Sequence, residues 1–176
     1  MAYKVAGAAA ERGDALDAVA SAARSLLEST RTMGVGLSPT ILPALGKPTF
    51  ELGEGEMEIG IGIHGERGVR RTELATADAI ADELFSAVVE ELSLQPADRV
   101  SVMVNGMGAT PLEELYIVYR RVAERLEGME VSVHRADIGE FATSLEMSGA
   151  SLTIVRLDDQ AIELLDAPAS SPFFRR

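Results

Sequence analysis

The chain has 176 residues, no cysteine, and 28 acidic against 16 basic side chains, which gives a formal net charge of −12. This charge argues against nucleic acid and anionic membrane surfaces as partners, because both attract clusters of Lys and Arg. The lack of cysteine excludes disulfides, zinc thiolate sites and cysteine nucleophiles. No secretion signal opens the chain and no apolar run reaches about 18 residues, so we expect a soluble, cytoplasmic protein.

The first part of the chain alternates between helical and extended patterns. Alanine-rich residues 1–13 look like the end of a helix that Gly13 stops, and Asp14 is a suitable cap for the next helix. The segment 65–74 is polar and predicts a loop. The other expected elements are a helix over 14–31, a strand over 33–38, turns near 43 and 46–48, and a strand over 57–64.

The second part predicts three helices and further strands. Residues 98–108 form the clearest strand, and because valines alternate with Met103, both of its faces are expected to be buried. Thr110 is the expected cap of the helix that follows, with Pro111 at its first position. The remaining expected elements are helices over 74–93, 111–127 and 159–165 (the last capped by Asp158), a strand over 130–139, one or two strands within 141–157, and a loosely attached tail over 167–176.

This order of helices and strands predicts an α/β domain with a mixed sheet. Hydrophobic residues make up 47% of the chain, which suits one domain with its own core, and we expect it to span residues 1–176. No internal repeat or low-complexity linker divides it.

His64, one of two histidines, is the main candidate for chemistry. In the predicted strand 57–64, Gly60, Gly62 and His64 share one face and the isoleucines share the other. A face without side chains lets a ligand or another backbone approach the imidazole closely. The structural alternative is a tight contact between strands, with the histidine bonded to a neighbouring carbonyl.

Two glycine-containing stretches have a second interpretation. "GIGIHGERG", residues 60–68, contains glycines suited to a phosphate cradle, but these lie within the predicted strand and the next helix starts several residues later. "NGMGATP", residues 105–111, follows a strand and opens a helix, where α/β sheets often bind ligands. Ordinary turn chemistry explains the same residues, and we favour it.

The remaining polar residues give weaker signals. His134 lies near a strand edge with no clustered partner, so we expect a surface or pairing role. No Ser-His-Asp arrangement can be argued from two isolated histidines, and no metal ligand set can be assembled. The acidic residues before the glycines look like a solvated strand face and turn: Glu51, Glu54, Glu56 and Glu58.

Five stretches carry a resemblance to a known family: GAAAERGDALDAV, GKPTFEL, EMEIGIGIHGERGV, DRVSVMVNGMGATPLEELY and EFATSLEMSGASLTIVRLDD…LLDAP. In that order they resemble the carboxy-terminal half of the dihydroxyacetone kinase substrate-binding subunit. The resemblance implies a two-layer domain, with helices packed on a mixed sheet of about six strands. It also implies that His64 is both the catalytic and the substrate-binding residue, forming a covalent hemiaminal with the ketone of a short ketose. An alcohol such as glycerol has no carbonyl and is excluded.

The resemblance also implies what this chain does not supply. The family's amino-terminal half carries an acid/base histidine in a Gly-His-Glu-Pro motif and a catalytic aspartate, and neither can be placed here. No cofactor is expected in this chain, since ATP or ADP with Mg²⁺ belongs to a nucleotide-binding partner subunit. The expected partners are therefore a ketose such as dihydroxyacetone, the amino-terminal half and that kinase subunit, with self-association left open.

Two functions follow from the resemblance. In the first, the chain is a kinase component that binds the ketose and is inactive until both partners are present. In the second, it is a non-enzymatic ketose sensor or regulatory subunit of the same family. The opening segment, which looks like the tail of a longer element, fits either a split gene product or a fragment.

Overall fold

The computed structural model describes residues 1–44, 46–172 and 174–175. Of Arg175, only the backbone is described. The helices are α1 (Ala2–Glu11), α2 (Leu16–Glu28), α3 (Ala77–Leu92), α4 (Leu112–Gly128) and α5 (Asp159–Asp166). The strands of the main sheet are β1 (Thr30–Gly36), β4 (Glu56–Ile59), β5 (Arg70–Glu73), β6 (Arg99–Gly106), β7 (Ser132–Gly139) and β8 (Gly149–Leu157). Two short ladders join β2 (Ile41–Leu42) to β3 (Lys47–Pro48), and β9 (Ser170–Ser171) to β10 (Phe174–Arg175).

The main sheet has six strands in the order β5-β4-β1-β8-β6-β7. Only β6 and β7 run parallel, and α4 forms the crossover between them. All other neighbours are antiparallel, so the sheet is mixed, as the sequence predicts.

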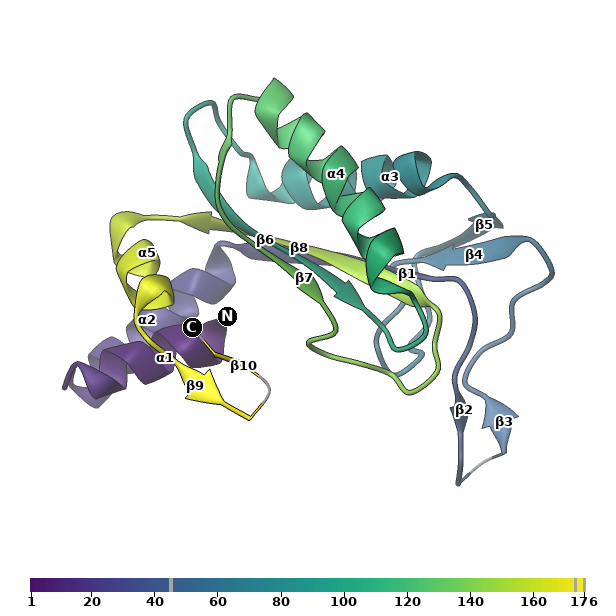
Figure 1. Cartoon of the computed structure of the whole chain (residues 1–176), viewed down its shortest axis with the longest axis horizontal. Coiled ribbons are helices and arrows are strands. Elements are labelled where there is room, and N and C mark those ends of the chain that lie inside the picture. Colours follow the sequence, from purple (N-terminus) through teal and green to yellow (C-terminus); the bar gives the residue numbers. More distant parts are fainter. Residues whose placement is uncertain (45, 173, 176) are drawn as a thin grey trace.

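Helices α3 and α4 cover one face of the sheet, above it in Figure 1. The core on this face contains fully buried side chains such as Val102 and Leu152, packed against Leu84 and Val122 of the two helices. Each side chain of this size stabilises the fold by about 1.5–3 kcal/mol through burial. On the opposite face of β6, Ser101 is also buried, which confirms the prediction that both faces of this strand are covered.

A second apolar cluster lies at one end of the opposite face. Helices α1, α2 and α5 pack there, and Leu26 and Leu165 contact the buried Val155 and Leu157 of β8. The middle of this face stays uncovered. Thr32 is exposed there, and its hydroxyl lies 2.9 Å from that of Thr153 on the neighbouring strand.

Several predicted helix ends differ from the observed ones. Helix α2 begins at Leu16 and ends at Glu28, short of the predicted 14–31. Asp14 does not cap it, because Arg12 binds both carboxylate oxygens at 3.0 and 2.6 Å. By contrast, Asp158 does cap α5, since its carboxylate accepts the N–H of Ala161 at 2.7 Å.

The predicted cap at Thr110 is also wrong. Its hydroxyl instead accepts the N–H of Gly149 at 2.8 Å and donates to the carbonyl of the same residue at 2.7 Å. Pro111 is the N-cap of α4 and not its first helical residue. This contact clamps the start of α4 to the start of β8.

Strand β1 runs from Thr30 to Gly36 where 33–38 was predicted, and the largest differences lie in the two strands that border the His64 segment. The predicted strand 57–64 ends at Ile59, and the predicted loop 65–74 contains β5, which pairs antiparallel with β4. The 141–157 region forms one strand, β8. In the tail predicted to be loosely attached, 167–176, β9 pairs with β10, and the Arg135 guanidinium lies 5.4 Å from the Phe174 ring. Residues 173 and 176 of that tail lie outside the described residues.

Candidate functional site

The candidate site is the loop between β4 and β5, residues 60–69, which we call the His64 loop. The strand stops because Gly60 adopts a left-handed φ of +80° and donates its N–H to the carbonyl of Gly34 at 2.6 Å. Gly60, Gly62 and His64 therefore do not share a strand face, and the prediction that they do is wrong. The isoleucines at 59 and 61 are buried as expected, and they anchor the loop to the core.

The glycines of the loop serve its internal packing. A Cβ on Gly62 would overlap the carboxylate of Glu66, and one on Gly65 would lie 2.7 Å from the Thr49 side chain. Gly65 also has a left-handed φ of +82°. The absence of a side chain at Gly62 thus makes room for the Glu66 carboxylate. It does not make room for a ligand, as the strand pattern indicated.

Glu66 holds the imidazole of His64 in one orientation. Its Oε1 lies 3.0 Å from Nδ1 of the ring, and its Oε2 accepts the backbone N–H of His64 at 3.0 Å. Hydrogen bonds from the N–H of Glu66 itself, from the His64 ring and from the His64 N–H lower the pKa of the Glu66 carboxyl. An ionised carboxylate only accepts hydrogen bonds, so the proton of a neutral ring is placed on Nδ1.

This orientation leaves Nε2 as the ring nitrogen without a contact to Glu66. With the proton on Nδ1, Nε2 carries a free lone pair, and 79% of the His64 side chain is exposed. A small carbonyl compound therefore has free access to it. The sequence analysis singled out His64 but not the orienting role of Glu66. The signal that could have indicated it is the position of Glu66 two residues after His64, between Gly65 and Gly68.

The base of the loop is pinned by Glu58, which the sequence reasoning assigned to a solvated face. Only 4% of Glu58 is exposed, and its carboxylate accepts the Gly68 N–H at 2.6 Å and lies 3.2 Å from the Arg71 guanidinium. A buried carboxylate needs such partners. Glu51 and Glu54 are exposed as expected, and Glu56 turns back to the N–H of Gly53 at 2.8 Å.

The two other sequence candidates have structural roles. His134 lies 3.0 Å from the carboxylate of Asp166, which ties β7 to α5. In the 105–111 segment, Asn105 accepts the N–H groups of Phe141 and Ala142 at 2.7 and 2.9 Å. Its amide donates to the carbonyl of Ala142 at 2.8 Å. These contacts support the turn interpretation of that segment.

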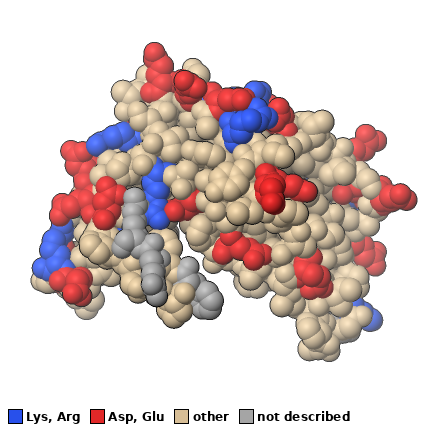
Figure 2. All heavy atoms as spheres, in the orientation of Figure 1, with Lys and Arg blue, Asp and Glu red and all other residues tan. Residues whose placement is uncertain are grey.

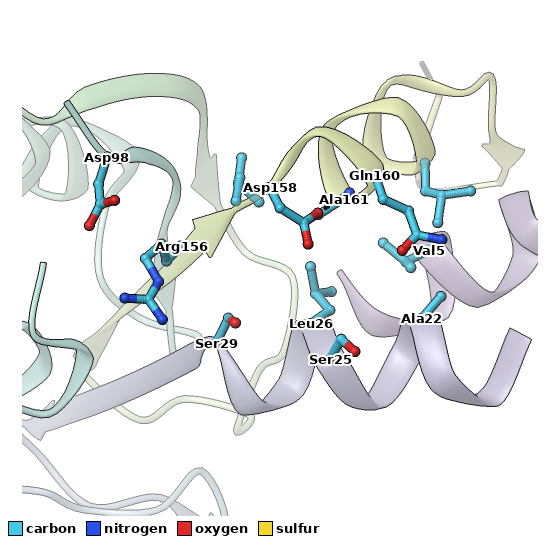
Figure 3. A pocket seen from close by; sticks show the side chains of 12 residues that line it. Val5, Ala22, Ser25, Leu26, Ser29, Asp98, Arg156, Asp158, Gln160 and Ala161 are labelled. Atoms are coloured by element: carbon cyan, nitrogen blue, oxygen red, sulfur yellow. Dashed lines mark hydrogen bonds between the residues drawn. The ribbon is translucent and has the colours of Figure 1, made fainter. Parts of the chain in front are cut away.

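Two hollows flank the His64 loop, and a third lies elsewhere. One, of about 510 Å³, runs along Gly65–Arg71, and the other, of about 330 Å³, lies between Gly60–Ile63 and Met107. The third, of about 320 Å³, lies between α2 and α5 at the other end of the sheet (Figures 1 and 3). Arg156 and Ser29 point into it. His64 lines none of the three, so its ring lies on the surface, next to the two hollows that flank the loop.

The described residues 1–44, 46–172 and 174–175 contain no group of three or more side chains arranged to hold a metal ion. Within the same residues, no helix is long and apolar enough to cross a bilayer. Figure 2 shows acidic side chains spread over the visible face, with the basic ones in small groups beside them.

The fold and the loop define a class of protein: a two-layer α/β module with an exposed histidine oriented by a carboxylate. The Dak1 domain model matches residues 1–173, and the chain belongs to this family. This confirms both the resemblance and the fold class drawn from the sequence.

Two relatives show how the family varies. The chain is 45% identical over 173 residues to the dihydroxyacetone-binding subunit DhaK of the PTS-dependent dihydroxyacetone kinase 2 of Listeria innocua, covering 98% of this chain and 52% of that subunit. It is 43% identical over 178 residues to the L-erythrulose 1-kinase of Mycolicibacterium smegmatis, covering 99% and 31%. The chain thus spans about half the length of DhaK and less of the erythrulose kinase.

Two solved structures are similar. The dihydroxyacetone kinase operon co-activator DhaQ has a TM-score of 0.88 at 35% identity, over 95% of this chain and 52% of that one. The dihydroxyacetone kinase of C. freundii in complex with AMP-PNP and Mg²⁺ has a TM-score of 0.75 at 29% identity, over 92% and 29%. The family therefore includes both kinases and a gene regulator.

Proposed function

We propose that this chain is the ketose-binding component of a dihydroxyacetone kinase or a related short-ketose kinase, and that His64 binds the ketose covalently. The observation that carries the proposal is the His64–Glu66 contact, which places the proton of a neutral ring on Nδ1 and leaves Nε2 exposed. The kinases among the relatives support the assignment, since they are dihydroxyacetone and erythrulose kinases, and both substrates are short ketoses.

The covalent step is a reversible addition. The Nε2 lone pair attacks the ketone carbon, an N–C bond forms, and the C=O π electrons move to the oxygen, which takes a proton from water. The ring then carries a positive charge and releases the Nδ1 proton through Glu66 to solvent, so that a neutral hemiaminal remains. The adduct holds a mobile three- or four-carbon substrate in one place, and positioning supplies much of the catalysis in phosphoryl transfer.

In this proposal the kinase needs two partners. The His64 side chain is 79% exposed, and among the residues that the structure describes only Glu66 is an acid or base bonded to its ring. A second polypeptide, corresponding to the amino-terminal half of DhaK, would complete the pocket and supply the acid/base groups. ATP or ADP with Mg²⁺ would be held by a nucleotide-binding subunit, and the chain alone would be inactive.

A second candidate is a ketose-sensing regulator. It is favoured by DhaQ, a co-activator whose TM-score of 0.88 exceeds the 0.75 of the kinase structure. Such a subunit would keep the hemiaminal and lack phosphoryl transfer. Reconstitution with a DhaK amino-terminal half and a nucleotide-binding subunit separates the two, because kinase activity appears only in the first case.

The test of the shared step is ¹³C NMR with dihydroxyacetone labelled at the carbonyl carbon. We expect the carbonyl signal to be replaced by a tetrahedral carbon signal on the wild-type chain, alone or with its partner half, and on the matched variant His134→Ala. His64→Ala should show neither the signal nor ketose-dependent activity after reconstitution. A His64→Ala protein that still gives the adduct would refute the assignment.

A further inference from the structure

We propose that the hollow along Gly65–Arg71 binds the phosphate group of a phosphorylated ligand, with Arg67 as the contacting side chain. The hollow has a volume of about 510 Å³ and is closed on its other side by Thr49 and Phe50. It begins at the residue that follows His64. The inference deepens the proposed function, since it places a phosphate subsite next to the ketose-binding atom.

The charge of Arg67 is not neutralised within the domain. In the part of the chain that the structure describes, no carboxylate lies within 4.0 Å of its guanidinium, and the residue is exposed. The neighbouring arginines are paired, Arg70 with Glu83 and Arg71 with Glu58. In a chain with a net charge of −12, an unpaired cation beside the nucleophile offsets the general repulsion of anions.

Several backbone N–H groups of the loop already have partners, which favours a side chain as the contact for an anion. Phosphate cradles use free N–H groups. Here the N–H of His64 donates to Glu66, that of Gly65 to the carbonyl of Gly62 at 3.0 Å, and that of Gly68 to Glu58. These three N–H groups are therefore not free for an anion, and the Arg67 side chain is the favoured contact.

The geometry of the hollow suits a phosphate. A guanidinium presents parallel N–H donors that match two phosphate oxygens. Glu58 at the base does not oppose an anion, since it is buried and paired with Arg71 and the Gly68 N–H. The ligand is either the ketose phosphate, with its carbonyl at His64, or the terminal phosphoryl group of the donor. Both present the same phosphate oxygens to Arg67.

The experiment follows the Nε–Hε resonance of Arg67 by NMR during titration with inorganic phosphate, dihydroxyacetone phosphate and ATP. We expect a saturable shift of this resonance in the wild type. Backbone amide resonances of the His64 loop, followed in both proteins, should show weaker binding in Arg67→Gln by about tenfold, the effect of roughly one charge-assisted hydrogen bond. The matched control is Arg24→Gln, since Arg24 is also exposed and unpaired in the described structure. A stronger response to dihydroxyacetone phosphate assigns the subsite to the product, and a stronger response to ATP assigns it to the donor.

Two results would overturn the inference. One is an Arg67 resonance that none of the three probes moves. The other is an equal loss in Arg67→Gln and Arg24→Gln, which would indicate a general effect of net charge. The proposed function is tested separately, because uncharged dihydroxyacetone should bind Arg67→Gln as it binds the wild type. If His64 forms no adduct while Arg67 still responds to phosphate, the ketose assignment fails and the subsite stands.

Discussion

Replacing Gly62 by alanine should disable His64 without touching the histidine. An added Cβ would overlap the carboxylate of Glu66 and come within 2.8 Å of its Cδ. These atoms are the far end of a flexible, exposed side chain, so we expect Glu66 to swing into solvent. The His64 ring then loses its acceptor at Nδ1, and the proton is free to move to Nε2.

We expect the adduct equilibrium constant to fall by about tenfold, in line with the roughly 10–100-fold cost of losing the residue that orients a metal-binding histidine. The thermal midpoint should stay close to that of the wild type, because no core contact changes. Two measurements check this: ¹³C NMR with labelled dihydroxyacetone, and ¹⁵N shifts of the His64 ring, which report the tautomer without any ligand.

The matched control is Gly7→Ala on α1, where an added Cβ would meet nothing within 4 Å. It should leave both the adduct and the tautomer unchanged. If Gly62→Ala keeps the wild-type tautomer, the contact with Glu66 does not set the protonation of the ring. If the tautomer changes while the adduct stays as strong, that protonation does not govern the nucleophile.

Two further predictions concern stability. Asp82 links α3 to α4, and hydrogen bonds from Arg121 and then Arg125 lower its pKa. The stabilisation that this ion pair gives the fold is therefore present above about pH 4, and it is lost as the pH falls through the lowered folded-state pKa. Asp82→Asn should therefore cost about 1 kcal/mol in urea unfolding at pH 7, and this difference from wild type should vanish in acid. The control Asp17→Asn, which loses only a helix-dipole interaction in the exposed first turn of α2, should cost less. A constant difference at all pH values would contradict the ion-pair explanation. Gly149→Ala places a Cβ against a backbone carbonyl of β1 and should cost about 1–3 kcal/mol in the same assay. The control is Gly128→Ala, where the added Cβ meets nothing within 4 Å. Equal stability of the two variants would disprove the close approach of β8 to β1 at Gly149.

The fold was largely predictable because its long elements have regular apolar patterns. Helix α3 keeps apolar residues at helical spacing, and β6 is apolar on both faces, so local pattern and tertiary burial agree. Helix ends were less predictable. Asp14 and Thr110 are good caps by type, but contacts with Arg12 and Gly149 bind their side chains instead.

The His64 loop shows more clearly what the sequence pattern could not predict. Alternating isoleucines and glycines predict a strand from the sequence, since nothing local shows that Gly60 pairs with Gly34 and takes a left-handed φ. Strand β5 was missed because its four residues, RRTE, contain no apolar side chain. The pattern singled out His64, but the contact with Glu66 that orients its ring came only from the fold.

The composition of β5 has a consequence for self-association. It is an edge strand of the sheet, and three of its four residues are charged. The other edge, β7, carries His134, Arg135 and Asp137. Charged side chains at both margins oppose the joining of two sheets into a continuous one, which protects the domain from open-ended aggregation. If copies of this chain pair, they should therefore do so face to face or through their helices.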